Sequence, residues 1–156
     1  PKDVIILFII VTLMGFTAGY LINLSAFILS ILIWIIGFLY NWRLKKAGFV
    51  GNLLVAISVS STFIMGGIVV GFPFENIVWY FAGLVLLIDL GEEIAADALD
   101  LKGDKITGSS SLAVKYGEQN AIKISSFIFY SVILYSFFPL YFPHSFYGCF
   151  YFIFHI

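Results

Sequence analysis

Residues 77–104 read IVWYFAGLVLLIDLGEEIAADALDLKGD, and this stretch decides the fold class. Residues 77–88 are apolar and uncharged, as in a helix that crosses a bilayer. From Asp89 onward the same stretch carries six of the nine acidic residues of the chain, with no proline to separate the two halves. A helix that begins in hydrocarbon and ends in carboxylates is typical of a membrane span with a functional site at one end.

The composition excludes an ordinary soluble domain. Hydrophobic residues make up 62% of the 156 residues, charged residues make up 11%, and the mean hydropathy is +1.07. A soluble domain of this length has too much surface to cover with so few polar groups. We therefore predict an all-α, polytopic transmembrane helix bundle, surrounded by membrane lipid and forming one domain over residues 1–156. We infer no nucleic-acid partner and no protein partner.

Other apolar stretches are also long enough to cross a bilayer. Besides the span that starts near residue 77, we predict full spans at residues 4–22, 24–40, 51–71 and 121–141, and the start of a sixth at 146–156. If the helices alternate in direction, one membrane face receives residues 1–3, 41–50 and 101–120. All eight Lys and Arg residues lie at or near that face, so the positive-inside rule predicts that it is cytoplasmic.

Local signals predict where the acidic helix begins and ends. Asn76 is a candidate N-cap, and Gly103 is the expected stop. The polar segments at residues 41–48 and 102–118 are expected to be loops. The Gly66-Gly67 pair is expected to serve helix packing, because small residues let neighbouring helices approach closely.

Five acidic residues fall on one face of this helix. At 100° per residue they lie within about an 80° arc; they are Asp89, Glu93, Asp97, Asp100 and Asp104. Mg²⁺ takes carboxylates together with phosphate oxygens, and Lys and Arg neutralise the remaining phosphate charge. The acidic face beside basic loops therefore predicts a Mg²⁺-dependent diphosphate site. The plainer alternative is a helix end that leaves the membrane with its acids solvated.

The remaining chemistry-bearing residues predict no second site. Cys149 lies in an aromatic stretch and is expected to be a small buried hydrophobe. His144 and His155 have similar surroundings and are not expected to bind a metal.

Three segments resemble a known family. Glu93-Ile-Ala-Ala-Asp97-Ala-Leu-Asp100-Leu-Lys-Gly103-Asp104 resembles the second aspartate-rich motif of the UbiA superfamily of intramembrane prenyltransferases. Residues 40–46 (YNWRLKK) and 51–56 (GNLLVA) are similar to the tyrosine–lysine loop of the family and the helix that follows it. Residues 63–71 (FIMGGIVVG) are similar to the archaeal branch, the digeranylgeranylglyceryl phosphate synthases.

The resemblance implies nine transmembrane helices around a cavity that opens toward the cytoplasm. It also implies two aspartate-rich motifs, bridged to a prenyl diphosphate by Mg²⁺. The predicted spans would correspond to the third to seventh of the nine helices, and the first aspartate-rich motif would precede Pro1. We therefore expect this chain to be the central part of a longer enzyme, truncated at both ends and inactive as a fragment.

The resemblance also implies roles for single residues. Asp97, Asp100 and Asp104 would bind Mg²⁺, and Tyr40 would donate a hydrogen bond to the leaving group or face the allylic cation. Four further residues would bind substrate: Arg43, Lys45, Asn52 and Glu93. The reaction would move a prenyl group from a prenyl diphosphate to a lipophilic acceptor, which in the archaeal branch is geranylgeranylglyceryl phosphate, the precursor of an ether lipid.

Two residues depart from the family pattern. Glu92 stands where the family usually has Arg, and Ala96 stands where a Lys is frequent, so both changes remove positive charge near the diphosphate. Three alternatives stay open: a UbiA-type enzyme with an aromatic, quinone-precursor acceptor, a cation-coupled transporter that uses the acidic face as an ion path, and a non-catalytic membrane subunit.

Overall fold

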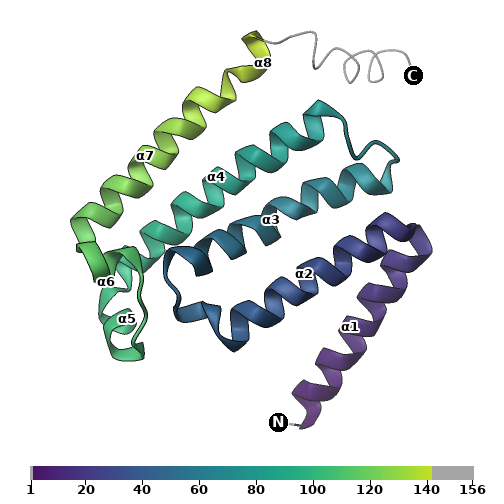
Figure 1. Cartoon of the computed structure of the whole chain (residues 1–156), viewed down its shortest axis with the longest axis horizontal. Helices are drawn as coiled ribbons and strands as arrows, with labels where there is room; N and C mark the ends of the chain where they lie inside the picture. Colours follow the sequence, from purple (N-terminus) through teal and green to yellow (C-terminus); the bar gives the residue numbers. More distant parts are fainter. Residues whose placement is uncertain (1, 142–156) are drawn as a thin grey trace.

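Helices account for nearly all of residues 2–141, the part of the chain that the computed structural model describes (Figure 1). In chain order they are α1 (Lys2–Ile22), α2 (Leu24–Trp42), the 3₁₀ helix η1 (Leu44–Lys46), α3 (Phe49–Val69), α4 (Asn76–Leu99), α5 (Leu101–Thr107), α6 (Leu112–Tyr116), α7 (Glu118–Ser136) and α8 (Phe138–Tyr141). The predicted all-α fold is confirmed. The predicted start of a sixth span, Cys149 and both histidines lie outside the described residues.

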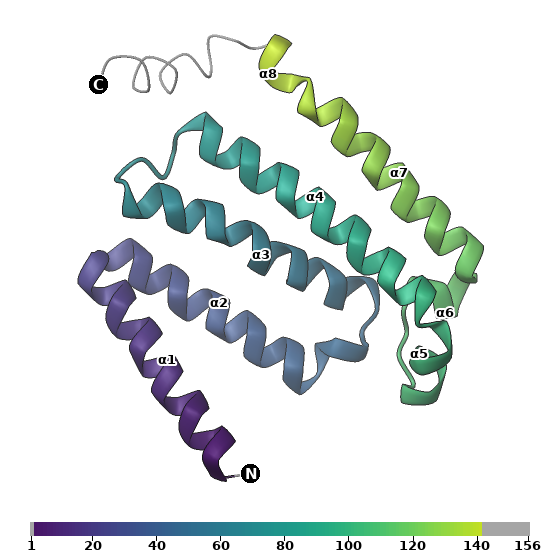
Figure 2. The same cartoon turned by 180° about the vertical axis from the view of Figure 1, so that it is seen from behind.

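The long helices are successive antiparallel neighbours, in the order α1, α2, α3, α4 and α7 (Figures 1 and 2). Among the described residues, four stretches are long and apolar enough to cross a membrane: α1, α2, α3 and Glu118–Leu140. α4 is the longest helix at 24 residues, but its carboxylates keep it out of that group. The fifth predicted span therefore rests on the length of α4 and on its position between α3 and α7.

Because neighbouring helices run in opposite directions, the polar connections lie together at one end of the bundle, where η1 contacts the segment containing α5 and α6 (Figure 1). The α1–α2 and α3–α4 turns lie at the opposite end. In the first of these turns the Asn23 side chain accepts a hydrogen bond from the N–H of Ala26 (2.8 Å) and donates to the carbonyl of Ile68 (3.3 Å). In the second, Glu75 is the N-cap of α4, so the prediction of Asn76 is wrong by one residue.

Small side chains bring α4 close to α3, α6 and α7. The buried cluster consists of Ala56, Leu90, Ile94, Ala98, Ala113 and Ala121. A Cβ added to Gly91 would meet Ile128 and Phe129 of α7 at 3.3 Å, and the Gly91 carbonyl accepts a 2.7 Å hydrogen bond from the Ser125 hydroxyl. This core holds one face of α4 in place and leaves another face for the acidic side chains.

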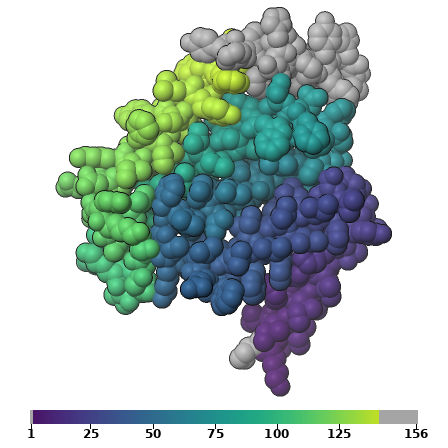
Figure 3. Space-filling view, viewed as in Figure 1, coloured from purple at the N-terminus to yellow at the C-terminus, as the bar shows by residue number. Residues whose placement is uncertain are grey.

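α1 lies at the edge of the bundle, and Figure 3 shows it projecting from the rest of the molecule. Gly19 is the buried residue of this helix, and its other side chains are largely exposed. Aromatic rings join α1 to α2, with Phe16 contacting Phe27 and Trp34 at centroid separations of 6.3 and 6.1 Å. The remaining apolar surface of α1 suits contact with lipid or with other membrane helices.

The predicted end of the acidic helix is wrong. α4 ends before Asp100, because the backbone of this residue (φ −98°, ψ 27°) leaves helical geometry, and Gly103 lies inside the separate helix α5. The glycine that ends this segment is Gly108, whose left-handed conformation (φ 71°) suits a residue without a side chain. The predicted loop at 102–118 therefore contains two short helices, and the five acidic residues do not share one continuous helix.

Candidate functional site

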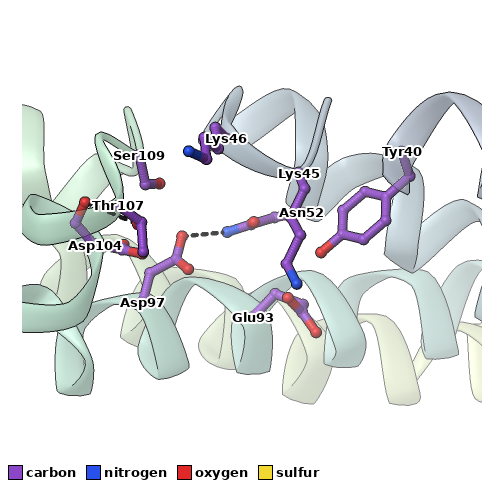
Figure 4. Close-up of a pocket in the computed structure, with 10 residues that line it drawn as sticks. Tyr40, Lys45, Lys46, Asn52, Glu93, Asp97, Asp104, Thr107 and Ser109 are labelled. Carbon is purple, nitrogen blue, oxygen red and sulfur yellow. Dashed lines mark hydrogen bonds between the residues drawn. The ribbon is translucent and has the colours of Figure 1, made fainter. Parts of the chain in front are cut away.

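A pocket opens at the polar end of the bundle (Figure 4). Its lining comes from the end of α2, from η1 and the start of α3, from α4, and from α5 with the loop that follows it. The lining residues are Tyr40, Lys45, Lys46, Gly48, Asn52, Glu93, Asp97, Asp104, Thr107 and Ser109. The fold thus brings together six of the eight predicted site residues, from segments that are far apart in the sequence.

Asn52 joins α3 to α4 inside this pocket. Its side-chain amide donates a hydrogen bond of 2.8 Å to Oδ2 of Asp97 (Figure 4). Asn52 is only 7% exposed, so its amide is shielded from water. A hydrogen bond to a charged group is worth about 1.5–3 kcal/mol. Asn52 therefore fixes one oxygen of Asp97 and leaves the other available to a ligand.

Tyr40, Lys45 and Glu93 occupy one side of the pocket, with the Lys45 side chain directed toward Glu93 (Figure 4). Gly51 allows α2, η1 and α3 to meet here, because an added Cβ would lie 2.7 Å from the carbonyl oxygen of Leu44 and 3.6 Å from the Tyr40 ring. This side offers a phenol, an ammonium group and a carboxylate to a ligand.

α5 and the loop after it form the other side of the pocket. The backbone carbonyl of Asp104 accepts hydrogen bonds from the N–H of Ser109 (2.9 Å) and the hydroxyl of Thr107 (3.2 Å). Oδ2 of the Asp104 carboxylate is buried and has no hydrogen-bond partner among the described residues. Because α4 ends before Asp100, Asp104 reaches the pocket from a second helix and faces Asp97 from there.

The two aspartates fit part of a Mg²⁺ site. Within residues 2–141, no three Asp, Glu, His or Cys side chains lie close enough to hold a metal ion together. Asp97 and Asp104 nevertheless line the same pocket, and each has a carboxylate oxygen that accepts no hydrogen bond from the described residues. Mg²⁺ is commonly bound by one or two carboxylates, with phosphate oxygens and water completing its coordination. The donor set thus suits an ion that arrives with a phosphate-containing ligand.

The charges of the pocket also favour such a ligand. Three carboxylates, on Glu93, Asp97 and Asp104, share a partly buried space with the ammonium groups of Lys45 and Lys46. Like charges in a desolvated space repel one another strongly. A cation between the aspartates and an anion beside the lysines would relieve both sets of repulsion.

Two predicted site residues do not line the pocket. Arg43 is exposed at the C-cap of α2. Asp100 is exposed at the break between α4 and α5, and its carboxylate lies over Gly103, where an added Cβ would be 2.5 Å from Oδ1. Their assignment to phosphate and metal binding stays a prediction.

Thr107 and Ser109 line the pocket, although they were not predicted as site residues. The two residues flank Gly108 in the sequence, and after the turn at this glycine the N–H of Ser110 bonds to the Lys46 carbonyl of η1. The signal available in the sequence was a pair of hydroxyl residues around a glycine directly after the aspartate-rich motif.

Known proteins match this chain over most of its length. The profile of the UbiA prenyltransferase family matches residues 1–156. A digeranylgeranylglyceryl phosphate synthase from Pyrococcus furiosus is 32% identical over 126 residues, which are 81% of this chain and 45% of that protein. The synthase of the same name from Sulfurisphaera tokodaii is 33% identical over 139 residues, which are 86% of this chain and 49% of that protein.

A third synthase of this name, from Methanothermobacter thermautotrophicus, is 35% identical over 113 residues, which are 72% of this chain and 38% of that protein. The chain thus spans less than half the length of these relatives. No solved structure matches it. Because the family profile covers the whole chain, the chain belongs to the UbiA prenyltransferase family.

Proposed function

We propose that the protein containing this chain is an intramembrane prenyltransferase, which moves a prenyl group from a prenyl diphosphate to a lipophilic acceptor. The relatives are named as synthases of digeranylgeranylglyceryl phosphate. The product in that name carries two geranylgeranyl groups, so the acceptor in the proposed reaction is geranylgeranylglyceryl phosphate and the product is an ether lipid.

One observation carries this proposal: aspartates and lysines meet in a pocket at the end of an apolar helix bundle. A prenyl diphosphate likewise has a polar part and an apolar part, because it carries a strongly anionic head group on a hydrocarbon chain. Lysines and metal-binding carboxylates suit the head group, and apolar helices suit the chain. The position of Asp97 and Asp104 at the polar end of the bundle speaks against the alternative of an ion path through the middle of the membrane.

In the proposed reaction the bond between C1 of the prenyl group and the diphosphate oxygen breaks. Diphosphate leaves with the electron pair, C1 bonds to the acceptor oxygen, and the proton of the acceptor hydroxyl passes to the Glu93 carboxylate. In this proposal Lys45 and Lys46, which line the pocket, neutralise the charge that develops on the diphosphate. In this proposal Tyr40 donates a hydrogen bond to the leaving oxygen, and Glu93, which lines the same side of the pocket, first accepts a hydrogen bond from the acceptor hydroxyl.

Asp97 and Asp104 are the residues that would hold Mg²⁺, with Asn52 orienting Asp97. When bound, the ion supplies positive charge that lowers the free energy needed to separate diphosphate from the allylic cation. The roles of Arg43 and Asp100 in binding rest on the family resemblance alone. The basic loops, and with them the pocket, are proposed to face the cytoplasm from the cell membrane.

The test is transfer of radiolabelled geranylgeranyl from its diphosphate to geranylgeranylglyceryl phosphate, by purified full-length protein in lipid nanodiscs. We expect an ether product that requires Mg²⁺ and is abolished by a chelator. Asp97→Asn should lower turnover by roughly 100-fold, since the developing charge loses several kcal/mol of stabilisation. Glu118→Gln is the matched control, because Glu118 is an exposed acid at the start of α7 and does not line the pocket.

Other results would redirect the assignment. Product formation only with an aromatic acceptor would place the protein with quinone-precursor prenyltransferases. No transfer to any acceptor, combined with cation flux into liposomes, would favour a transporter. If the protein shows neither prenyl transfer nor cation flux, the result would favour a non-catalytic membrane subunit.

A further inference from the structure

Three consecutive serines follow Gly108, and the structure gives each a different role. Ser109 lines the pocket. Ser111 is fully buried, and its hydroxyl oxygen accepts a hydrogen bond from the N–H of Val114 (3.4 Å) at the start of α6. Ser110, between them, does neither and reaches across to η1 instead.

Ser110 contacts the backbone of Lys46 through two donors. Its N–H and its hydroxyl donate to the carbonyl oxygen of Lys46, at 3.0 and 2.9 Å. The two residues are 64 positions apart in the sequence, so this contact joins two separate connections of the bundle. Two hydrogen bonds to one carbonyl restrain both the position and the direction of its peptide group.

Gly48, two residues after Lys46, packs against the backbone of the same serine, Ser110. It is buried and adopts a left-handed backbone conformation, with φ 62°. A Cβ at this position would collide with the carbonyl group of Ser110. The two loop backbones therefore touch without an intervening side chain. We call Lys46, Gly48 and Ser110 the loop clasp.

The loop clasp holds the backbone of η1, the helix that carries the two lysines of the pocket. Lys45 and Lys46 are consecutive residues of η1, a helix of 3 residues, and their side chains enter different parts of the pocket (Figure 4). Lys45 is directed toward Glu93, whereas Lys46 lies near Ser109. Lysine side chains are flexible, so the reach of both ammonium groups depends on where the η1 backbone is held. Small displacements of charged groups from a reacting ligand reduce catalysis substantially.

We infer that Ser110 is a positioning residue, which acts through the loop clasp to hold Lys45 and Lys46 where they bind a diphosphate head group opposite Asp97 and Asp104. The identity of the anion rests on the proposed function. The restraint of η1 by Ser110 is independent of the proposed function and can be measured separately.

The decisive comparison is between Ser110→Ala, which removes the hydroxyl donor and keeps the N–H, and Ser110→Thr, which keeps both. Ser131→Ala is the matched control, since its hydroxyl donates to the Phe127 carbonyl (3.0 Å) within α7, outside the pocket. In the full-length protein, Ser110→Ala should weaken binding of inorganic diphosphate with Mg²⁺ about fivefold, the effect of one lost hydrogen bond. It should also raise KM for the prenyl diphosphate more than it lowers kcat. Ser110→Thr and Ser131→Ala should match the wild type.

Amide hydrogen exchange measures the loop clasp without substrate. Ser110→Ala should accelerate exchange in residues 43–48 and leave α7 unchanged. Unchanged exchange in residues 43–48 would overturn the loop clasp. Faster exchange with unchanged diphosphate affinity and KM would overturn the positioning role. Wild-type protein that binds no diphosphate would instead contradict the proposed function, together with the role of the lysines in it.

Discussion

At the residue scale, the amide of Asn52 determines how Asp97 faces the pocket. Asn52→Ala would remove the buried donor and free the carboxylate to turn. The lost bond to a charged group should lower kcat/KM for prenyl transfer roughly 10- to 100-fold. Transfer kinetics at limiting Mg²⁺ measure this effect.

Ser61→Ala is the control for Asn52. Ser61 is a buried residue of the same helix, and its hydroxyl donates to the Ile57 carbonyl at 2.6 Å without lining the pocket. Equal activity of both variants would remove Asn52 from the site.

Asp89 differs from Asp97, because none of the described residues donates a hydrogen bond to the buried oxygen of its carboxylate. Its Oδ2 is buried and accepts no hydrogen bond from the described residues, and the residue does not line the pocket. Asp89→Asn removes the charge at nearly constant volume, so it should stabilise the protein by about 1 kcal/mol. The measurement is the thermal unfolding midpoint in detergent.

Glu92→Gln is the control for Asp89. Glu92 is exposed on the same helix, so this substitution should leave the unfolding midpoint unchanged. A lower midpoint in Asp89→Asn would show that the Asp89 carboxylate has a stabilising partner.

At the element scale, the two glycines of the Gly66-Gly67 pair behave differently. A Cβ at Gly67 would lie 2.9 Å from Val78 of α4 and 3.2 Å from the Phe72 carbonyl, whereas Gly66 has no neighbour within 4 Å. The expectation that the pair serves helix packing thus holds for Gly67 alone.

These environments predict opposite effects of the same substitution. Gly67→Ala should destabilise the protein by about 1–3 kcal/mol through overpacking. Gly66→Ala should be neutral or stabilise it by up to about 1 kcal/mol, because alanine favours the helical conformation. Unfolding in detergent compares them directly, and equal effects would contradict the close approach of α3 and α4 at Gly67.

The difference between the predicted and observed ends of α4 has a physical reason. Apolarity and helical periodicity are local properties, so they predicted the long helices and most of the acidic face. The break at Asp100 has no glycine or proline at residues 98–102, so no local stop signal marks it in the sequence. Gly103 carried the expected stop signal, but the left-handed turn falls at Gly108. Thr107 ends α5 directly before that turn and Ser109 follows it, and both line the pocket.

At the scale of the whole molecule, the arrangement predicts which loops share a membrane face. Lys115 lies at the polar end of the bundle and Glu75 at the opposite end, and both are exposed. Single cysteines at these positions, in a Cys149→Ser background, should react with a membrane-impermeant reagent from opposite sides of oriented vesicles. Lys115→Cys should be labelled only from the cytoplasmic side. Labelling of both variants from one side would contradict the topology.

The contact between Lys46 and Ser110 has a consequence for biosynthesis. Neighbouring helices in this bundle are mostly neighbours in the chain, so α1 to α4 can associate as each one leaves the ribosome. The pocket cannot form in that way, because η1 must wait until the chain has extended 64 residues further and Ser110 has been added. During that interval Lys45 and Lys46 are already at the membrane surface while α5 has yet to fold. Helices α1 to α3 are therefore assembled before the pocket closes, whereas α7 follows Ser110 in the chain. A ribosome stalled within α4 would carry a membrane-inserted chain whose η1 still exchanges its amide hydrogens freely.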